Sequence, residues 1–299
     1  MTTINAMIQL REIDLPAMLA LSPSDRLLQR AKGLCRIVVG GSERGNEILE
    51  LFQRSPLRVA FPRMGLDDVN EAVLINTGGG IAGGDHLECE VTAVTNASIA
   101  VTTQTAERVY RALDKPAHIS TKLRVNDAST LAWLPQETII FNSAQLRRVT
   151  EVEISPGAQL LALEWLVFGR VAHGEQLIGG QLSDRWLVKK DGRLIWADAF
   201  HTGEQVFRHL KRRALLGNCK GIATMIYFGP ELDKRLEFLR DIAGSIGCIC
   251  AATSVAGLMI VRLAAETSSN LKLGLRALLH QLGSEFGYGP FRAPKMWSC

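Results

Sequence analysis

Short segments of strand character, each followed by turn residues, recur over about 170 positions from Gly33 to Phe200. In several of them apolar and polar residues alternate, as they do where one face of a strand is buried and the other is solvated. The clearest hairpin lies in WLVKKDGRLIWADAF, residues 186–200, where Asp191 and Gly192 supply the two positive-φ positions of a tight turn. This pattern predicts a mainly β protein.

The individual strands are expected at 34–39, 57–61, 72–75, 86–93, 98–103, 119–125, 138–141, 149–154 and 159–168. Helical spacing appears only in the C-terminal third. Pro230 precedes leucines and an isoleucine spaced by three and four up to Ile242, and Gly244 follows. A second leucine-rich stripe covers 271–282, so about two α-helices are expected there.

Composition limits the class of protein. Hydrophobic residues make up 47% and charged residues 21% of the 299, which is typical of a folded chain. A net charge of +4 is too weak to indicate nucleic-acid binding. No apolar run reaches the length of about 18 residues that a membrane helix needs, and no N-terminal segment has the pattern of a signal peptide. We therefore expect a cytoplasmic protein with no membrane or nucleic-acid partner.

Two residue types in the sequence favour ordinary structural roles. Six cysteines are scattered along the chain, which argues against a disulfide framework, and Cys248 and Cys250 are interpreted as apolar packing. Basic residues cluster at 208–213 and at Arg147 and Arg148. Both clusters are interpreted as solvated surface.

The stretch NTGGGIAGGD, residues 76–85, matches the dinucleotide-binding spacing at Gly78, Gly80 and Gly83. A dinucleotide site needs a helix after the glycines, because the helix N-terminus binds the pyrophosphate. Here DHLECEVTA follows, which has the alternation of a strand, and nothing acidic lies between Glu90 and Glu107. The glycines are therefore interpreted as a tight connection between strands, with a nucleotide-dependent oxidoreductase as the unfavoured alternative.

No catalytic constellation is visible. The sequence contains neither a G-x-S-x-G elbow nor a histidine pair at metal-binding helical spacing.

The best candidates for metal ligands are Asp85 with His86, Glu88 and Glu90, which share one strand region. Alternation places His86, Glu88 and Glu90 on one side of that strand, where they would offer mixed nitrogen and oxygen donors. His173 and Glu175 form a second candidate group. An ordinary solvent-facing strand explains the alternation of the first group and is the favoured interpretation.

Several blocks, in order, resemble the urease accessory protein D family, called H in some organisms. They are PLRVAFPR, NTGGGIAGGD, TTQTAERVYRA, WLPQETIIF, EWLVFGRVAHGE and FRAPKMWSC. Lys295 stands where the family pattern has arginine, and Asn76 with Thr77 also departs from that pattern. The resemblance implies a single domain over residues 30–299 after a variable extension over 1–29.

The resemblance also implies a fold and a function. The family has an elongated helical arrangement of strands, in distorted β-sheets, with two helices. Its members are not enzymes but scaffolds or chaperones that assemble with accessory protein F and the GTPase accessory protein G on apo-urease and assist nickel insertion. Some members bind nickel or provide an internal route for it, so a self-sufficient nickel carrier is the alternative. No tightly bound cofactor is expected, and nickel is expected to bind only transiently.

The candidate nickel ligands are the polar groups in or beside these blocks. The metal set is Asp85, His86, Glu88 and Glu175, with Glu107 and Glu137 as further hypotheses.

Overall fold

The fold was analysed in a computed structural model of the chain. It describes residues 29–42, 45–62, 70–94, 96–170, 174–203, 207, 209–287 and 289–298. The chain divides into two compact units, Met1–Arg30 and Ala31–Cys299, and the account below concerns the second. The predicted extension over 1–29 falls almost wholly outside the described residues.

Two facing sheets make up most of this unit. The seven-stranded sheet has the order β14-β13-β11-β8-β5-β1-β2, and the ten-stranded sheet has the order β16-β17-β15-β12-β9-β6-β4-β3, with β10 joined to β12 and β7 to β10. The strands of the first sheet are β1 (Lys32–Ser42), β2 (Gly45–Arg54), β5 (His86–Val94), β8 (Ala117–Val125), β11 (Gln145–Ile154), β13 (Gln181–Lys190) and β14 (Arg193–Thr202). Those of the second are β3 (Leu57–Ala60), β4 (Asn70–Asn76), β6 (Ser98–Thr103), β7 (Glu107–Val109), β9 (Thr130–Trp133), β10 (Thr138–Ile140), β12 (Gln159–Phe168), β15 (Gly221–Phe228), β16 (Ile249–Val255) and β17 (Leu258–Ala265).

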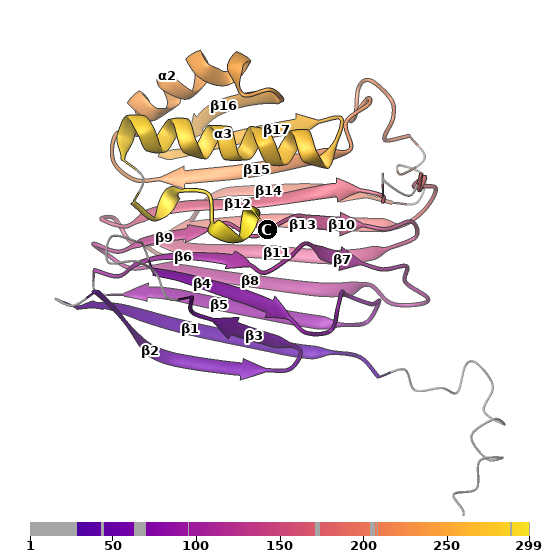
Figure 1. The fold of residues 1–299 in the computed structure, drawn as a ribbon, viewed down its shortest axis with the longest axis horizontal. Helices are drawn as coiled ribbons and strands as arrows, with labels where there is room; N and C mark the ends of the chain where they lie inside the picture. The colour runs from indigo at the N-terminus through magenta and orange to yellow at the C-terminus, as the bar shows by residue number, and fades with distance from the viewer. Residues whose placement is uncertain are drawn as a thin grey trace, which may run out of the picture. The chain divides into compact units, whose positions relative to one another are not determined.

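The chain winds between the sheets as a solenoid. It passes from the first sheet to the second at β5–β6, β8–β9 and β11–β12, and each new strand pairs in parallel with its counterpart from the turn before. Figure 1 shows the result as a colour gradient, from β1 and β2 at one end to β16 and β17 at the other. The predicted helical arrangement of strands is confirmed.

The helices cover the ten-stranded sheet at its C-terminal end. They are α2 (Leu232–Ile242) and α3 (Ser268–Phe286), with short 3-10 turns η3 (Ala243–Ser245), η4 (Gly289–Phe291) and η5 (Lys295–Ser298). In α3 the Thr267 side chain accepts the N–H of Asn270 at 3.1 Å and so caps the first turn. The leucine stripe predicted over 271–282 is buried in the core beneath this helix, and Figure 1 shows α3 lying over the ten-stranded sheet.

Two apolar cores therefore separate three layers. One core lies between the two sheets, and the other lies between the ten-stranded sheet and the helices. Strand β12 contributes to both, because Leu160 and Leu166 face one core while Leu161 and Trp165 face the other. A strand buried on both faces has no polar alternation, which explains why its sequence is apolar apart from Gln159 and Glu164.

The expected strands all lie on observed ones, and Asp191 and Gly192 both have positive φ, at 51° and 74°, as the predicted hairpin turn requires. The solvated interpretation of Arg147 and Arg148 is wrong for Arg148, which is only 2% exposed. Inward-facing positions of β11 alternate with outward-facing ones, so these two neighbours point to opposite faces of the sheet.

Candidate functional site

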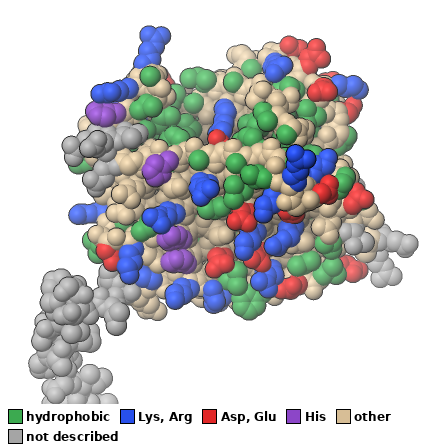
Figure 2. Space-filling model, turned by 180° about the vertical axis from the view of Figure 1, so that it is seen from behind, with side chains coloured by type: hydrophobic (Ala, Val, Ile, Leu, Met, Phe, Trp, Pro, Cys, Tyr) green, Lys and Arg blue, Asp and Glu red, His purple; other side chains and the backbone are tan. Residues whose placement is uncertain are grey.

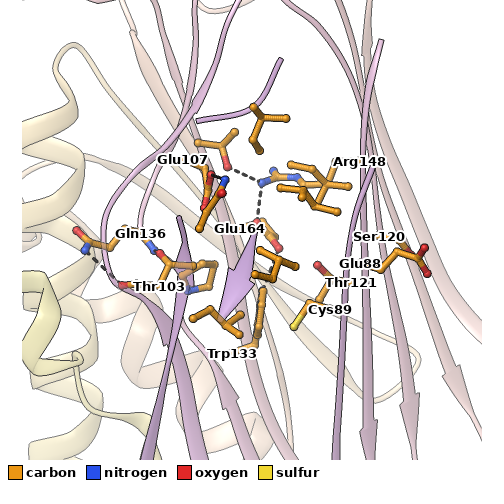
Figure 3. Close-up of a pocket in the computed structure, with 18 residues that line it drawn as sticks. Glu88, Cys89, Thr103, Glu107, Ser120, Thr121, Trp133, Gln136, Arg148 and Glu164 are labelled. Atoms are coloured by element: carbon orange, nitrogen blue, oxygen red, sulfur yellow. Dashed lines mark hydrogen bonds and ion pairs between the residues drawn. The ribbon is translucent and has the colours of Figure 1, made fainter. Parts of the chain in front are cut away.

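A buried ion network joins the two sheets. The Arg148 guanidinium, on β11, donates from Nε and Nη2 to the two carboxylate oxygens of Asp184 on β13, at 2.8 and 2.7 Å. Its Nη1 crosses the core and donates to Glu164 on β12 at 2.6 Å. Figure 3 shows Arg148 and Glu164 pointing toward each other from facing sheets. The network fixes how β11 and β12 sit opposite each other.

Neutral groups complete the network around Glu164. The Trp133 indole N–H donates to Oε1 at 2.9 Å, and the Thr138 hydroxyl accepts from Arg148 at 3.1 Å. Burial raises the pKa of the Glu164 carboxyl, and the attraction of Arg148 opposes this rise. Burial also penalises the Arg148 charge, but Asp184 and Glu164 outweigh that penalty and raise the pKa of Arg148. Arg148 therefore stays charged in the core.

A cavity of ≈ 70 Å³ lies beside this network. Its wall includes Glu107, Cys89 and Thr103, and Figure 3 places these groups around the space between the two sheets. Burial raises the pKa of Glu107, although the Asn76 amide donates to its Oε2 at 2.9 Å. Glu107 has one fixed side-chain donor, and a carboxylate of that kind can accept a divalent cation when it is ionised.

The glycine stretch is a tight connection, as interpreted from the sequence. Strand β5 begins at His86, directly after it, so the helix that a dinucleotide site requires does not begin there. A Cβ on Gly83 would lie 2.5 Å from the carbonyl oxygen of Lys115, and one on Gly80 would overlap the Tyr110 ring. These glycines therefore serve the close approach of neighbouring chain segments.

The buried Asp85 side chain holds this connection in place through hydrogen bonds to the backbone. Its carboxylate accepts the N–H of Ala31 through Oδ1 and the N–H of Ala82 through Oδ2, both at 2.8 Å, and the residue is only 7% exposed. Both oxygens therefore satisfy backbone donors.

The next candidates face outward, as predicted. His86, Glu88 and Glu90 lie on the solvent side of β5, whereas Leu87 and Cys89 are buried. Glu90 is paired with Arg36 at 2.8 Å and with Lys122 at 3.3 Å, and the hydrogen bond from Arg36 contributes most to lowering the pKa of Glu90.

The parallel register brings a second histidine beside His86. His86 and His118 are register partners on β5 and β8, and their rings stack with centroids 4.5 Å apart and planes at 8°. His118 was absent from the sequence candidates, because nothing in the sequence indicates which strand will pair with β5.

Glu175 lies in a different environment. It accepts the backbone N–H of Arg170 at 2.9 Å and pairs with the same residue's guanidinium at 3.2 Å. Although partial burial acts against it, these contacts and the N–H of Asn142 hold the pKa of Glu175 below its usual range. His173 lies outside the described residues.

Glu137 precedes β10, and its Oε2 is buried without a hydrogen-bond partner among the described residues.

Nowhere in the described ranges do three or more imidazole, thiol or carboxylate groups form a cluster that could hold a metal ion. Likewise, none of the described helices has the length and apolarity needed to cross a membrane.

The fold and site define a β-solenoid protein whose facing sheets are joined by a buried ion network and whose outer strands carry the exposed polar candidates. Comparison with known proteins identifies the family. The sequence model described as "UreD urease accessory protein" matches residues 31–298. A urease accessory protein UreD of Mesorhizobium japonicum is 37% identical over 276 residues, covering 92% of this chain and 96% of the relative. UreD 1 proteins of Brucella anthropi and Brucella melitensis are each 36% identical, over 90% and 91% of this chain and 95% of each relative. The chain belongs to the UreD family of urease accessory proteins, which takes part in urease maturation.

Proposed function

We propose that this chain is a non-catalytic cytoplasmic scaffold that assembles with accessory protein F and the GTPase accessory protein G on apo-urease and assists nickel insertion. The observation that carries the proposal is the family match, which extends over 31–298 and so includes the described strands of both sheets and the helices α2 and α3. The role of the glycines supports it as well: they serve close packing, which leaves nucleotide hydrolysis to the GTPase partner.

Co-purification tests the proposed assembly. Tagged chain is expressed together with F and G, and the complex is followed by size-exclusion chromatography at several salt concentrations, with and without nickel. A complex of fixed stoichiometry is the expected result. The tag alone serves as the control for nonspecific capture. The proposal fails when no association occurs under any of these conditions.

Nickel enters the proposal as cargo. Asp85, His86, Glu88 and Glu175 remain its candidate ligands, and His86 and Glu88 are the pair that faces solvent on one strand. Glu107 is the candidate inside, on the wall of the cavity between the sheets. An outward site suits a self-sufficient carrier, whereas an inward one suits a scaffold through which nickel passes.

Equilibrium dialysis of the chain with nickel separates these two roles. Tight stoichiometric binding that is lost in His86→Ala and Glu88→Ala indicates the carrier. Weak binding that these changes leave intact indicates the scaffold, which we expect. Glu107→Gln is the matched interior variant. If nickel binding is reduced in this variant alone, nickel contacts the chain inside the cavity.

A further inference from the structure

A transverse row of basic and imidazole side chains crosses the outer face of the seven-stranded sheet. Consecutive register partners place it on six strands: Lys32 pairs with His86, His86 with His118, His118 with Arg147, Arg147 with Ser183 and Ser183 with His201. We call Lys32, His86, His118, Arg147 and His201 the basic row. Neighbouring strands lie about 4.8 Å apart, so the row spans roughly 24 Å.

The row is accessible and carries no carboxylate. Lys32, His86, Arg147 and His201 are exposed, and His118 is half-buried. Part of it lines a shallow groove of ≈ 360 Å³, to which Arg185 adds a further positive charge. Figure 2, which views this face, shows histidines toward the left with basic side chains around them, and basic and acidic side chains mixed farther across.

The histidine pair adds imidazole nitrogens to the lining of this groove, and Nδ1 of His86 lies 3.2 Å from the Gly84 carbonyl oxygen. Lys32 pairs with His86 and Arg185 lines the groove, so both add positive charge around the pair, whereas Glu88 and Glu151 oppose it. A carboxylate bound here would be attracted by the fixed charges of Lys32, Arg147 and Arg185.

The basic row is narrow, and its width favours an extended peptide over nucleic acid as the ligand. Glu88 lies one row beyond the basic row, and Glu90 and Glu151 lie two rows beyond it, where Arg36 and Lys122 pair with Glu90. Because charges of both signs alternate there, these rows offer no wide basic surface of the kind that the phosphates of nucleic acid need. An extended peptide is narrow, and side chains on one of its faces recur about every 7 Å, so roughly four carboxylates would fit along the row.

We propose that the basic row is a docking surface for an extended acidic segment of a partner protein, with Asp or Glu at alternate positions. The inference goes beyond the proposed scaffold function and rests on the outer sheet face alone. Bound carboxylates pair with Arg147 and Lys32 and accept hydrogen bonds from the imidazoles that lie between them in the row.

Fluorescence anisotropy tests this proposal with full-length chain and a labelled alternating Glu–Ser peptide of about 16 residues, long enough to cross the row. EDTA is present so that no metal bridges the two. We expect saturable binding that weakens as the salt concentration rises, because the contacts join exposed charges. Arg147→Gln should weaken it about tenfold, the usual effect of losing one charge-assisted hydrogen bond.

A matched control variant separates docking from general effects. Arg124→Gln removes the same charge from an exposed position of β8 near the opposite end of this face, and it should leave affinity within about twofold. Absence of saturable binding overturns the proposal. Equal losses in Arg147→Gln and Arg124→Gln, or tighter binding of an oligothymidine competitor than of the peptide, also overturn it.

Discussion

Arg147 and Arg148 are neighbours on one strand, yet they occupy opposite physical environments. Arg148 is buried between the carboxylates of Asp184 and Glu164, whereas Arg147 is exposed beside His118. Strand alternation alone separates them. The inward group holds the two sheets together, and the outward group is free to meet a partner. The same division applies to the other candidate residues of the site.

The largest difference is expected between the two arginines themselves. Arg148→Ala leaves two buried carboxylates without their counter-charge and should destabilise the protein by about 3–5 kcal/mol. Arg147→Ala removes an exposed side chain and should cost about 0.5 kcal/mol or less. Urea unfolding of both variants measures the difference. Similar losses in the two would mean that the Arg148 network does not stabilise the fold.

Asp85 and His86 provide a second inward and outward pair, with a smaller expected effect. Asp85→Asn places an amide donor against one of two backbone N–H groups and should cost about 1–3 kcal/mol. His86→Gln should change stability by no more than about 0.5 kcal/mol. Thermal unfolding measures both. A near-neutral Asp85→Asn would show that its two hydrogen bonds do not hold the glycine connection.

The smallest expected effect is on the pH dependence of stability, and its sign differs between the buried Glu107 and the solvent-facing Glu90. Burial raises the pKa of Glu107, so this residue makes the folded protein lose stability as the pH rises above the ordinary pKa of glutamate. The pKa of Glu90 is lowered chiefly by Arg36, so its contribution is present at neutral pH and is lost as the pH falls.

Unfolding of Glu107→Gln and Glu90→Gln near pH 4 and near pH 7 should therefore give opposite trends, each of about 1 kcal/mol or less. Relative to the unchanged protein, Glu107→Gln gains stability on going to neutral pH and Glu90→Gln loses it. Trends of the same sign would contradict the assigned environments.

Local patterns in the sequence predicted much of the fold. The hairpin at Asp191–Gly192 and the helix ending at Ile242 follow from turn chemistry and from apolar spacing within one element. Strand β2 was not predicted, because Ile48 and Leu49 are exposed on an edge strand and no regular alternation marks it. An edge strand has a neighbour on one side only, so burial imposes less pattern on its sequence.

The site depends on contacts between distant segments, and these were not predictable. Arg148 meets Asp184, 36 residues later, and His86 meets His118 because β5 and β8 pair in parallel. One feature did point to the network: Glu164 is the single charged residue in the apolar strand QLLALEWLVF. A buried carboxylate needs a partner, but the sequence does not identify which cation supplies it.

The most direct test of the assigned role is urease activity in a urease-producing host from which this chain has been deleted. We expect activity to fall to background without the chain and to return when the chain is supplied on a plasmid. Excess nickel should restore at most part of it, because the scaffold and not the metal is missing. Full urease activity in the deletion strain would contradict the account.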